Sequence, residues 1–212
     1  MERGKFITLE GGEGTGKSTQ AHLLATRLAR AGIPVHTTRE PGGSTGAEHI
    51  RELLVRGEVL RWDPMTESLL HFAARRDHLE KTVRPALARG EWVVCDRFAD
   101  STMAYQGFGM GLGRQAVESL YRLVAETFAP DLTLILDLPV EEGLRRAAAR
   151  AGTDTRYERM DASFHERVRG GFQAIAAAEP GRCALIDARP DAGAVHRAVC
   201  AAVSERLGIS VS

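Results

Sequence analysis

The chain has 212 residues, of which 43% are hydrophobic and 26% are charged, as in a folded globular protein and unlike a disordered one. Its 28 basic residues balance its 28 acidic residues, so we expect no nucleic acid partner and no membrane partner. Uninterrupted apolar stretches are about five residues long, far shorter than a membrane span. We see no signal peptide near the first residues and expect a cytoplasmic protein.

The cysteines and histidines form no pattern of a disulfide-rich or metal-binding protein. Cys95, Cys183 and Cys200 are far apart in sequence, and we interpret them as small, buried apolar residues. The seven histidines include no H-E-x-x-H pair, so we predict no structural zinc.

Apolar runs alternate with helical patterns along the whole chain. We predict strands at residues 5–10, 35–39, 92–95, 132–138 and 183–186. We predict helices at residues 18–31, 48–55, 67–79, 114–127, 141–150, 162–178 and 191–207, the third of which continues towards Pro85. This alternation indicates an α/β fold with a parallel sheet and helices on both of its faces. No repeat or linker divides the chain, so we predict a single domain over residues 1–212.

Two local patterns give more specific expectations. The alternating glycines Gly107, Gly109, Gly111 and Gly113 predict a flexible loop. Asp137 ends a predicted strand shortly before a predicted helix, and we expect its side chain to cap that helix at Val140 rather than to take part in catalysis.

A phosphate-binding pattern lies between the first predicted strand and the first predicted helix. The residues that fit G-x-x-x-x-G-K-[ST] are Gly11, Gly12, Glu13, Gly14, Thr15, Gly16, Lys17 and Ser18. The glycines allow backbone N–H groups to surround phosphate oxygens, and the helix N-terminus adds a favourable dipole. We expect Lys17 to reach the β- and γ-phosphates of a nucleoside triphosphate and Ser18 to bind Mg²⁺.

A phosphate loop indicates a nucleoside triphosphate but not the reaction. A GTPase usually reads guanine with Asn-Lys-x-Asp, and this chain contains no asparagine. We also expect none of the appended modules of an ATP-driven machine, which argues against that class. A small-molecule kinase remains, in which positioning and charge neutralisation carry most of the catalysis.

Several segments together resemble the thymidylate kinase family. They are residues 10–19 (EGGEGTGKST), 38–44 (TREPGGS), 72–75 (FAAR), 96–107 (DRFADSTMAYQG) and 136–139 (LDLP). The resemblance covers most of residues 5–190 and implies a P-loop nucleoside-monophosphate kinase fold with a five-stranded parallel sheet. It also implies phosphorylation of dTMP by ATP with Mg²⁺, and assembly into a homodimer.

The same resemblance assigns roles to individual side chains. Asp96 would hold a Mg²⁺-bound water or orient the acceptor, and Arg97 would clamp the 5′-phosphate of the acceptor. Arg75 would read the base edge, and Glu13 would orient the acceptor sugar through its 3′-hydroxyl. The other implied residues are Thr19 at the ATP phosphates and Arg39, His71, Phe72, Ser101, Thr102, Tyr105 and Gln106 in the acceptor site.

One acceptor-site position departs from the family pattern. Four residues before Arg75 the family commonly has a phenylalanine that stacks on thymine, whereas this chain has His71 followed by Phe72. A neutral imidazole can stack, but it offers a smaller apolar area. If His71 stacks on the base, we expect its protonation at about pH 6.5 to weaken the binding of dTMP.

The family varies in the position of the arginine that stabilises the charge of a phosphoryl-transfer transition state. Some family members carry this arginine in the phosphate loop after its acidic residue, but here Gly14 follows Glu13. Members with glycine there carry arginines in a lid that closes over ATP. We therefore predict a lid at about residues 150–159, with Arg156 as the transition-state arginine and Arg150 as a second ATP-binding arginine.

Three functions remain open at this point. The first is a dTMP kinase, and the second is a related P-loop kinase that acts on another nucleoside monophosphate or on a deoxynucleoside. The third is a nucleotide-bound regulatory module without phosphoryl transfer. Arg75, Arg97 and Tyr105 are all present in the acceptor segments, which favours a kinase over the regulatory module.

Overall fold

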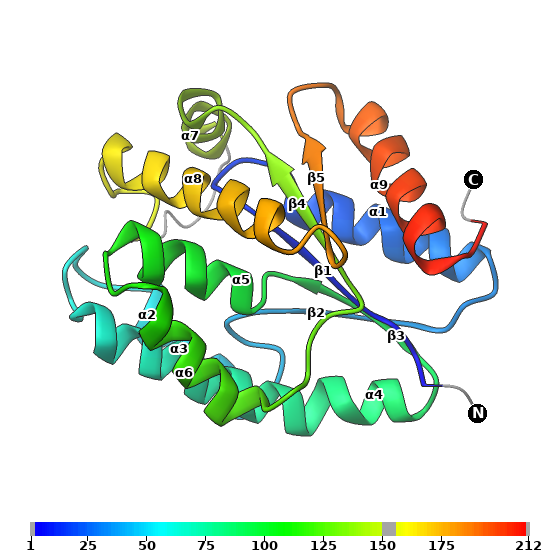
Figure 1. Ribbon diagram of the computed structural model, residues 1–212, viewed down its shortest axis with the longest axis horizontal. Coiled ribbons are helices and arrows are strands. Elements are labelled where there is room, and N and C mark those ends of the chain that lie inside the picture. The colour runs from blue at the N-terminus through cyan, green and yellow to red at the C-terminus, as the bar shows by residue number, and fades with distance from the viewer. Residues whose placement is uncertain (1–2, 150–155, 211–212) are drawn as a thin grey trace.

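The computed structural model describes residues 3–149 and 156–210, and five parallel strands form its central sheet. The strands are β1 (Phe6–Gly11), β2 (Val35–Arg39), β3 (Trp92–Asp96), β4 (Leu132–Asp137) and β5 (Cys183–Asp187). Their order in the sheet is β2-β3-β1-β4-β5 (Figure 1). Every residue of the central strand β1 is buried, as expected for a parallel sheet that is covered on both faces. The predicted α/β class and five-stranded sheet are confirmed.

Helices cover both faces of this sheet (Figure 1). The α-helices are α1 (Lys17–Arg30), α2 (Thr45–Val55), α3 (Pro64–His78), α4 (Arg84–Ala88), α5 (Ala99–Thr102), α6 (Arg114–Ala125), α7 (Val140–Ala148), α8 (Ala162–Ala178) and α9 (Ala192–Leu207). Two π-helical segments, η1 (Leu79–Val83) and η2 (Met103–Gly109), continue α3 and α5. No helix in these described parts of the chain is both long and apolar enough to cross a membrane.

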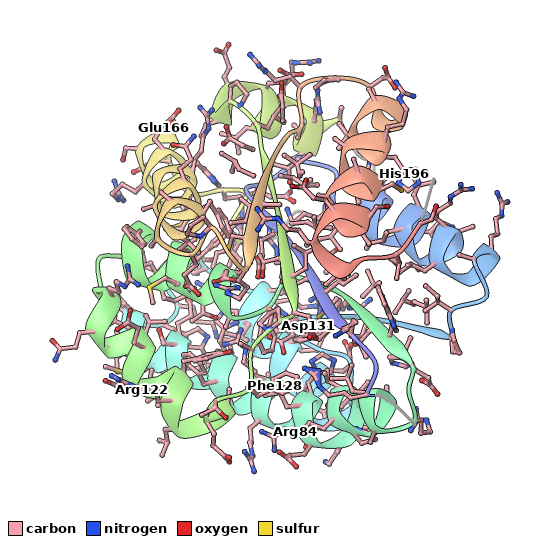
Figure 2. The ribbon with its side chains drawn as sticks, turned by 45° about the vertical axis from the view of Figure 1, so that its right-hand side comes forward. Arg84, Arg122, Phe128, Asp131, Glu166 and His196 are labelled. Atoms are coloured by element: carbon pink, nitrogen blue, oxygen red, sulfur yellow. The ribbon has the colours of Figure 1, made fainter. Side chains whose placement is uncertain are left out.

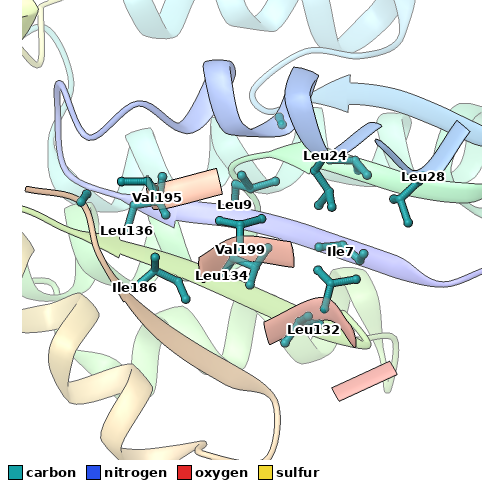
Figure 3. Close-up of a cluster of buried hydrophobic side chains, with 14 of the residues drawn as sticks. Ile7, Leu9, Leu24, Leu28, Leu132, Leu134, Leu136, Ile186, Val195 and Val199 are labelled. Carbon is teal, nitrogen blue, oxygen red and sulfur yellow. The ribbon is translucent and has the colours of Figure 1, made fainter. Parts of the chain in front are cut away.

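The alternation of side chains along each strand produces a hydrophobic core on each face of the sheet. Ile7 and Leu9 of β1 and Leu134 of β4 face α1 and α9, where Leu24 and Val199 complete one cluster (Figure 3). The residues that alternate with them face the other side of the sheet. There, one cluster contains Phe6, Val93 and Phe98 together with the η1–α4 segment, and another contains Ile135 together with η2 and α8.

Residues near the N-terminal ends of the strands show how the second face is closed. Arg84 of α4 lies over the ring of Phe128 with its guanidinium carbon 5.6 Å from the ring centroid, on the side of the sheet that Figure 2 shows below β1. The carboxylate of Asp131 accepts a hydrogen bond of 2.7 Å from the backbone N–H of Phe6. This contact joins the turn before β4 to the start of β1.

Most predicted elements agree with the structure to within a few residues, and β2 and α8 have the predicted bounds. The predicted flexible loop of alternating glycines is partly wrong, because Gly107 and Gly109 lie inside η2. A β-carbon on Gly109 would lie 2.7 Å from the ring of Phe164 and 2.8 Å from a methyl group of Val168. Glycine at this position therefore allows η2 to pack closely against α8.

The predicted helix cap by Asp137 is also wrong. Helix α7 follows Pro139 and has no side-chain cap, whereas the Asp137 carboxylate accepts hydrogen bonds of 2.8 and 2.9 Å from Arg169 of α8. An arginine that approaches from the neighbouring helix outcompetes the backbone N–H groups because the bidentate ion pair is the stronger contact. Cys95 and Cys183 are buried as predicted, and Cys200 is partly exposed.

Candidate active site

The phosphate loop connects β1 to α1 and carries Lys17 at the first turn of the helix. Gly14 has a φ of 67°, and a β-carbon there would lie 2.0 Å from the carbonyl oxygen of Gly143 in α7. A side chain at position 14 is thus excluded by both backbone conformation and contact. The Lys17 ammonium group donates to the carbonyl oxygen of Gly12 at 2.6 Å and curls over the loop. Burial, and secondarily Arg97, lower the pKa of Lys17 to about 8.

Ser18 and Asp96 face each other at the edge of this loop. The Ser18 hydroxyl donates to a carboxylate oxygen of Asp96 at 2.5 Å, although the two residues are far apart in the sequence. Asp96 is the last residue of β3, the strand beside β1, so the sheet order itself brings the two side chains together. A hydroxyl and a carboxylate oxygen are ligands that suit Mg²⁺.

Arg97 follows Asp96 with a φ of 70°, a left-handed conformation that costs a residue other than glycine about 1–3 kcal/mol. This conformation turns its guanidinium towards the phosphate loop, where it donates to the carbonyl oxygen of Gly11 at 3.0 Å and to Glu13 at 3.1 Å. It also donates to the hydroxyls of Ser101 and Tyr105, each at 3.1 Å. The strained backbone therefore delivers a fixed cation to the centre of the site.

Glu13 is the acidic partner of this cation. It accepts a hydrogen bond of 2.7 Å from the Tyr105 hydroxyl as well as the bond from Arg97. Burial alone would raise the pKa of Glu13, but Arg97 and Lys17 outweigh it and lower this pKa to about 2. Glu13 is therefore ionised across the whole physiological range.

A second acid, Glu10, lies behind Arg97 at the end of β1 and was not predicted. Its carboxylate accepts from the backbone N–H of Phe98 at 2.7 Å and from the hydroxyl of Ser101 at 2.5 Å. It thus holds the segment that carries Arg97. Burial, and then the charge of Asp100, raise the pKa of Glu10 to about 7.

Arg75 of α3 lies on the opposite side of the site and is 2% exposed. Its Nε atom donates to Glu40 at 2.8 Å, and one terminal nitrogen donates to Thr102 at 3.1 Å. The other terminal nitrogen, Nη1, is buried and finds no partner among the described residues. Glu40 in turn accepts from His78 at 2.9 Å, so the acid is itself held in place.

Gln106 of η2 is fully buried and resembles Arg75 in this respect. Its Nε2 atom donates to Glu67 at 2.7 Å, and its Oε1 atom has no partner in the described part of the chain. An unpaired buried donor and an unpaired buried acceptor are uncommon, and each calls for an explanation.

Most of these groups line one cavity of about 430 Å³, the size of a typical small-molecule site. The predicted residues along it are Glu13, Gly14, Gly16, Lys17, Ser18, Thr19, Arg39, His71, Arg75, Asp96, Arg97, Ser101, Thr102, Tyr105 and Gln106. Gly11, Gly12 and Thr15 lie in the phosphate loop without lining the cavity. The cavity also contains Arg51 and Arg146, which no sequence motif singled out. Its size and its cationic wall suit a phosphorylated nucleoside.

A family model for thymidylate kinase matches residues 9–199 of the chain. The chain belongs to the thymidylate kinase family. It is 56% identical over 209 residues to a thymidylate kinase of Caulobacter vibrioides, covering 99% of this chain and 100% of the relative. It is 52% identical over 210 residues to that of Gluconobacter oxydans, covering 98% and 97% of the two chains.

A crystal structure of thymidylate kinase from Ehrlichia chaffeensis has the same fold. It aligns with a TM-score of 0.79 and 37% sequence identity, over 95% of this chain and 99% of the other. The present chain phosphorylates dTMP, and its family uses ATP as the phosphoryl donor.

Phe72 was predicted in the acceptor site, but it does not line the cavity. It is 1% exposed, and the Arg75 guanidinium carbon lies 4.8 Å from its ring centroid. Phe72 lies on a different face of α3 from His71, because adjacent helical residues are about 100° apart. Its ring packs against the Arg75 guanidinium.

His71 does line the cavity, but the expected titration at about pH 6.5 is wrong. Its Nε2 atom lies 3.0 Å from the hydroxyl of Tyr157. Burial, and then the charges of Arg75 and Arg156, lower the pKa of His71 to about 3. A pKa of about 3 keeps the ring neutral near neutral pH.

Arg156, the predicted transition-state arginine, does not line the cavity in this structure. It is 1% exposed, and it forms an ion pair with the buried carboxylate of Glu67. Its Nε and Nη1 atoms donate to the carbonyl oxygens of Leu54 and Val59 at 2.5 and 2.9 Å. All three guanidinium nitrogens are thus used inside the protein. Arg150 and most of the predicted lid lie outside the described residues.

Proposed function

We propose that the cavity binds dTMP with its base against Arg75 and Gln106 and its 5′-phosphate near Arg97. The observation that carries this assignment is the pair of buried, unpartnered atoms: a donor, Nη1 of Arg75, and an acceptor, Oε1 of Gln106. Thymine presents an acceptor, O4, next to a donor, N3–H. Cytosine presents these two functions in the reverse order, so the pair favours thymine.

ATP would bind at the phosphate loop with its transferred phosphate between Lys17 and Arg97. Both side chains line the cavity, and they would offset the negative charge of the two substrates. The pKa of Glu13 is about 2, so its carboxylate is ionised near neutral pH and is a weak base for proton transfer. Its roles would be to hold Arg97 and to orient the acceptor sugar, with the Tyr105 hydroxyl as the neighbouring donor.

Mg²⁺ would be held by Ser18 and Asp96, whose oxygens already lie within hydrogen-bond distance of each other. When bound, Mg²⁺ neutralises phosphate charge and fixes the orientation of the phosphate oxygens. Asp96 would also orient the phosphate acceptor from the end of β3. Arg150 would be the ATP-binding arginine of the lid, because Arg156 forms an ion pair with Glu67.

Arg39 and Arg51 would also contribute to phosphate binding. Arg51 of α2 donates to the carbonyl oxygen of Pro41 at 2.6 Å and lines the cavity beside Arg39. Burial, and then the like charge of Arg39, lower the pKa of Arg51 below its usual value. Like charges held close together are relieved when an anion binds, which favours the 5′-phosphate of dTMP at this end of the cavity.

A second copy of the chain would cover the exposed apolar residues of α2, α3 and α6. These residues are Leu53, Met65, Leu69 and Leu123, which are 40%, 39%, 50% and 78% exposed. The three helices pack side by side, and large apolar side chains gathered on one surface typically mark an interface. We expect a homodimer by light scattering at micromolar concentration and a monomer for Leu69→Glu with Leu123→Glu.

The residue assignments are tested by the acceptor range of purified protein and of one matched pair of variants. ADP formation from ATP is measured with dTMP, dUMP, dCMP and dAMP as acceptors. Arg75→Lys keeps the charge beside Glu40 but loses the planar fork, so we expect kcat/KM for dTMP to fall at least tenfold. Arg76→Lys changes an exposed neighbour and should leave it unchanged. Equal activities of the two variants would refute the role of Arg75.

A further inference from the structure

Glu67 of α3 collects hydrogen-bond donors from two distant parts of the chain. Its side chain is fully buried. One carboxylate oxygen accepts from Gln106 of η2 and from the Tyr157 hydroxyl, both at 2.7 Å. The other oxygen accepts from the guanidinium of Arg156. Gln106 and Tyr157 both line the cavity, so this buried acid lies directly behind its wall.

This cluster fixes the orientation of the Gln106 amide. An ionised carboxylate can only accept hydrogen bonds, so the atom of Gln106 that faces Glu67 must be the NH₂ group. The amide oxygen of Gln106 is then directed elsewhere, and it is the buried acceptor without a partner among the described residues. Rotating the amide by half a turn would bring two acceptors together and is strongly disfavoured.

The other donors keep Glu67 in its accepting role. Arg156 supplies a full positive charge, and the carbonyl oxygens of Leu54 and Val59 hold its remaining nitrogens. Tyr157 donates its single hydroxyl hydrogen to Glu67, so His71 must be the donor in its own contact with Tyr157. Glu67 therefore accepts from Gln106, Arg156 and Tyr157 and donates to none of them.

We propose that Glu67 is a positioning residue for base selection, which holds Gln106 so that only its amide oxygen is presented to the acceptor base. This inference rests on the proposed contact between Gln106 and the base. An oxygen at that point accepts from N3–H of thymine and repels the unprotonated N3 of cytosine. Glu67 would thereby discriminate against dCMP without touching it, and Arg156 would serve the same purpose by balancing its charge.

The test replaces the carboxylate by an amide in Glu67→Gln and measures kcat/KM for dTMP and for dCMP. A glutamine at position 67 can donate as well as accept, so the Gln106 amide becomes free to present either atom. We expect the ratio of kcat/KM for dTMP over dCMP to fall at least tenfold. Glu205→Gln makes the same chemical change at an exposed position of α9 and should leave the ratio unchanged.

A merely structural role would lower both kcat/KM values together and leave their ratio as in the parent, which would overturn the proposal. The Gln106→Met variant lacks the amide oxygen and should also lose discrimination between dTMP and dCMP. Adding Glu67→Gln to it should not change the ratio further. If Glu67→Gln fails to fold because Arg156 is left unpaired, Glu67→Gln with Arg156→Met is measured in its place. A parent enzyme that does not prefer dTMP over dCMP would instead refute the proposed base contact itself.

Discussion

Replacing Arg156 by alanine separates two explanations of the same residue. Its position in the predicted lid suggests a role in the transition state, whereas its contacts make it the partner of a buried carboxylate. If the transition-state role were right, Arg156→Ala would lower kcat at least a hundredfold in a normally stable protein. If the ion pair is its role, the main loss is in the free energy of unfolding.

The size of that loss follows from the contacts. Removing one member of a buried ion pair leaves an uncompensated charge and costs about 3–5 kcal/mol. The carbonyl oxygens of Leu54 and Val59 also lose their donors, which places the cost towards the upper end of that range. Each kcal/mol lowers Tm by about 2–4 °C in a protein of this size. We therefore expect a decrease in Tm of about 10–20 °C.

The assay is thermal and urea unfolding of Arg156→Ala beside Arg159→Ala, in which an exposed arginine of the same turn is changed. Arg159→Ala should stay within about 0.5–1 kcal/mol of the parent, since surface substitutions are usually mild. Kinetics of both variants are measured well below their Tm values. An Arg156→Ala protein of parental stability with a hundredfold lower kcat would refute the reasoning and restore the transition-state role.

Three further outcomes are expected. Lys17→Ala should abolish phosphoryl transfer and leave the circular dichroism spectrum unchanged, and activity within tenfold of the parent would contradict the assignment. Because the pKa of His71 is about 3, KM for dTMP should vary with pH between 6 and 7.5 in the same way for the parent and for His71→Phe. A pH dependence that His71→Phe removes would show that the ring titrates after all. Glu13, whose pKa falls from 4.5 to about 2, should stabilise the fold by roughly 3 kcal/mol above pH 4.5 and lose this contribution as the pH falls towards 2. Urea unfolding of the parent and of Glu13→Gln checks this, and a stability difference that does not shrink on acidification would refute it.

The fold and the phosphate end of the site could be predicted because their signals are local. The phosphate loop is a contiguous pattern, and Asp96 and Arg97 follow directly on a strongly apolar strand. Parallel strands bring their carboxyl ends to one edge of the sheet, so the approach of Asp96 to Ser18 follows from topology. Segments with clear periodicity, such as α8, were predicted with their observed bounds.

The structure differs from expectation where a residue's partner is distant in sequence. Arg156 and Glu67 are 89 residues apart, and no local sequence pattern indicates that they form a pair. The depressed pKa of His71 depends on burial and on arginines from other segments. The sequence around Gly109 predicts a loop, and only the packed structure shows that Gly109 lies against Phe164. In each case the spatial neighbours of the residue are set by tertiary packing, which a local sequence pattern does not reveal.

The base end of the cavity shows what this distinction means for function. Arg75 and Gln106 are the side chains that would meet the base, and each is held by one buried carboxylate, Glu40 for Arg75 and Glu67 for Gln106. The two acids leave opposite atoms unpaired, a donor in one case and an acceptor in the other. Burying a carboxylate is costly unless it is paired. Glu40 lines the cavity and Glu67 lies behind its wall, and the two acids are therefore best explained by the direction that each imposes on its partner, because base selection depends on the order of a donor and an acceptor.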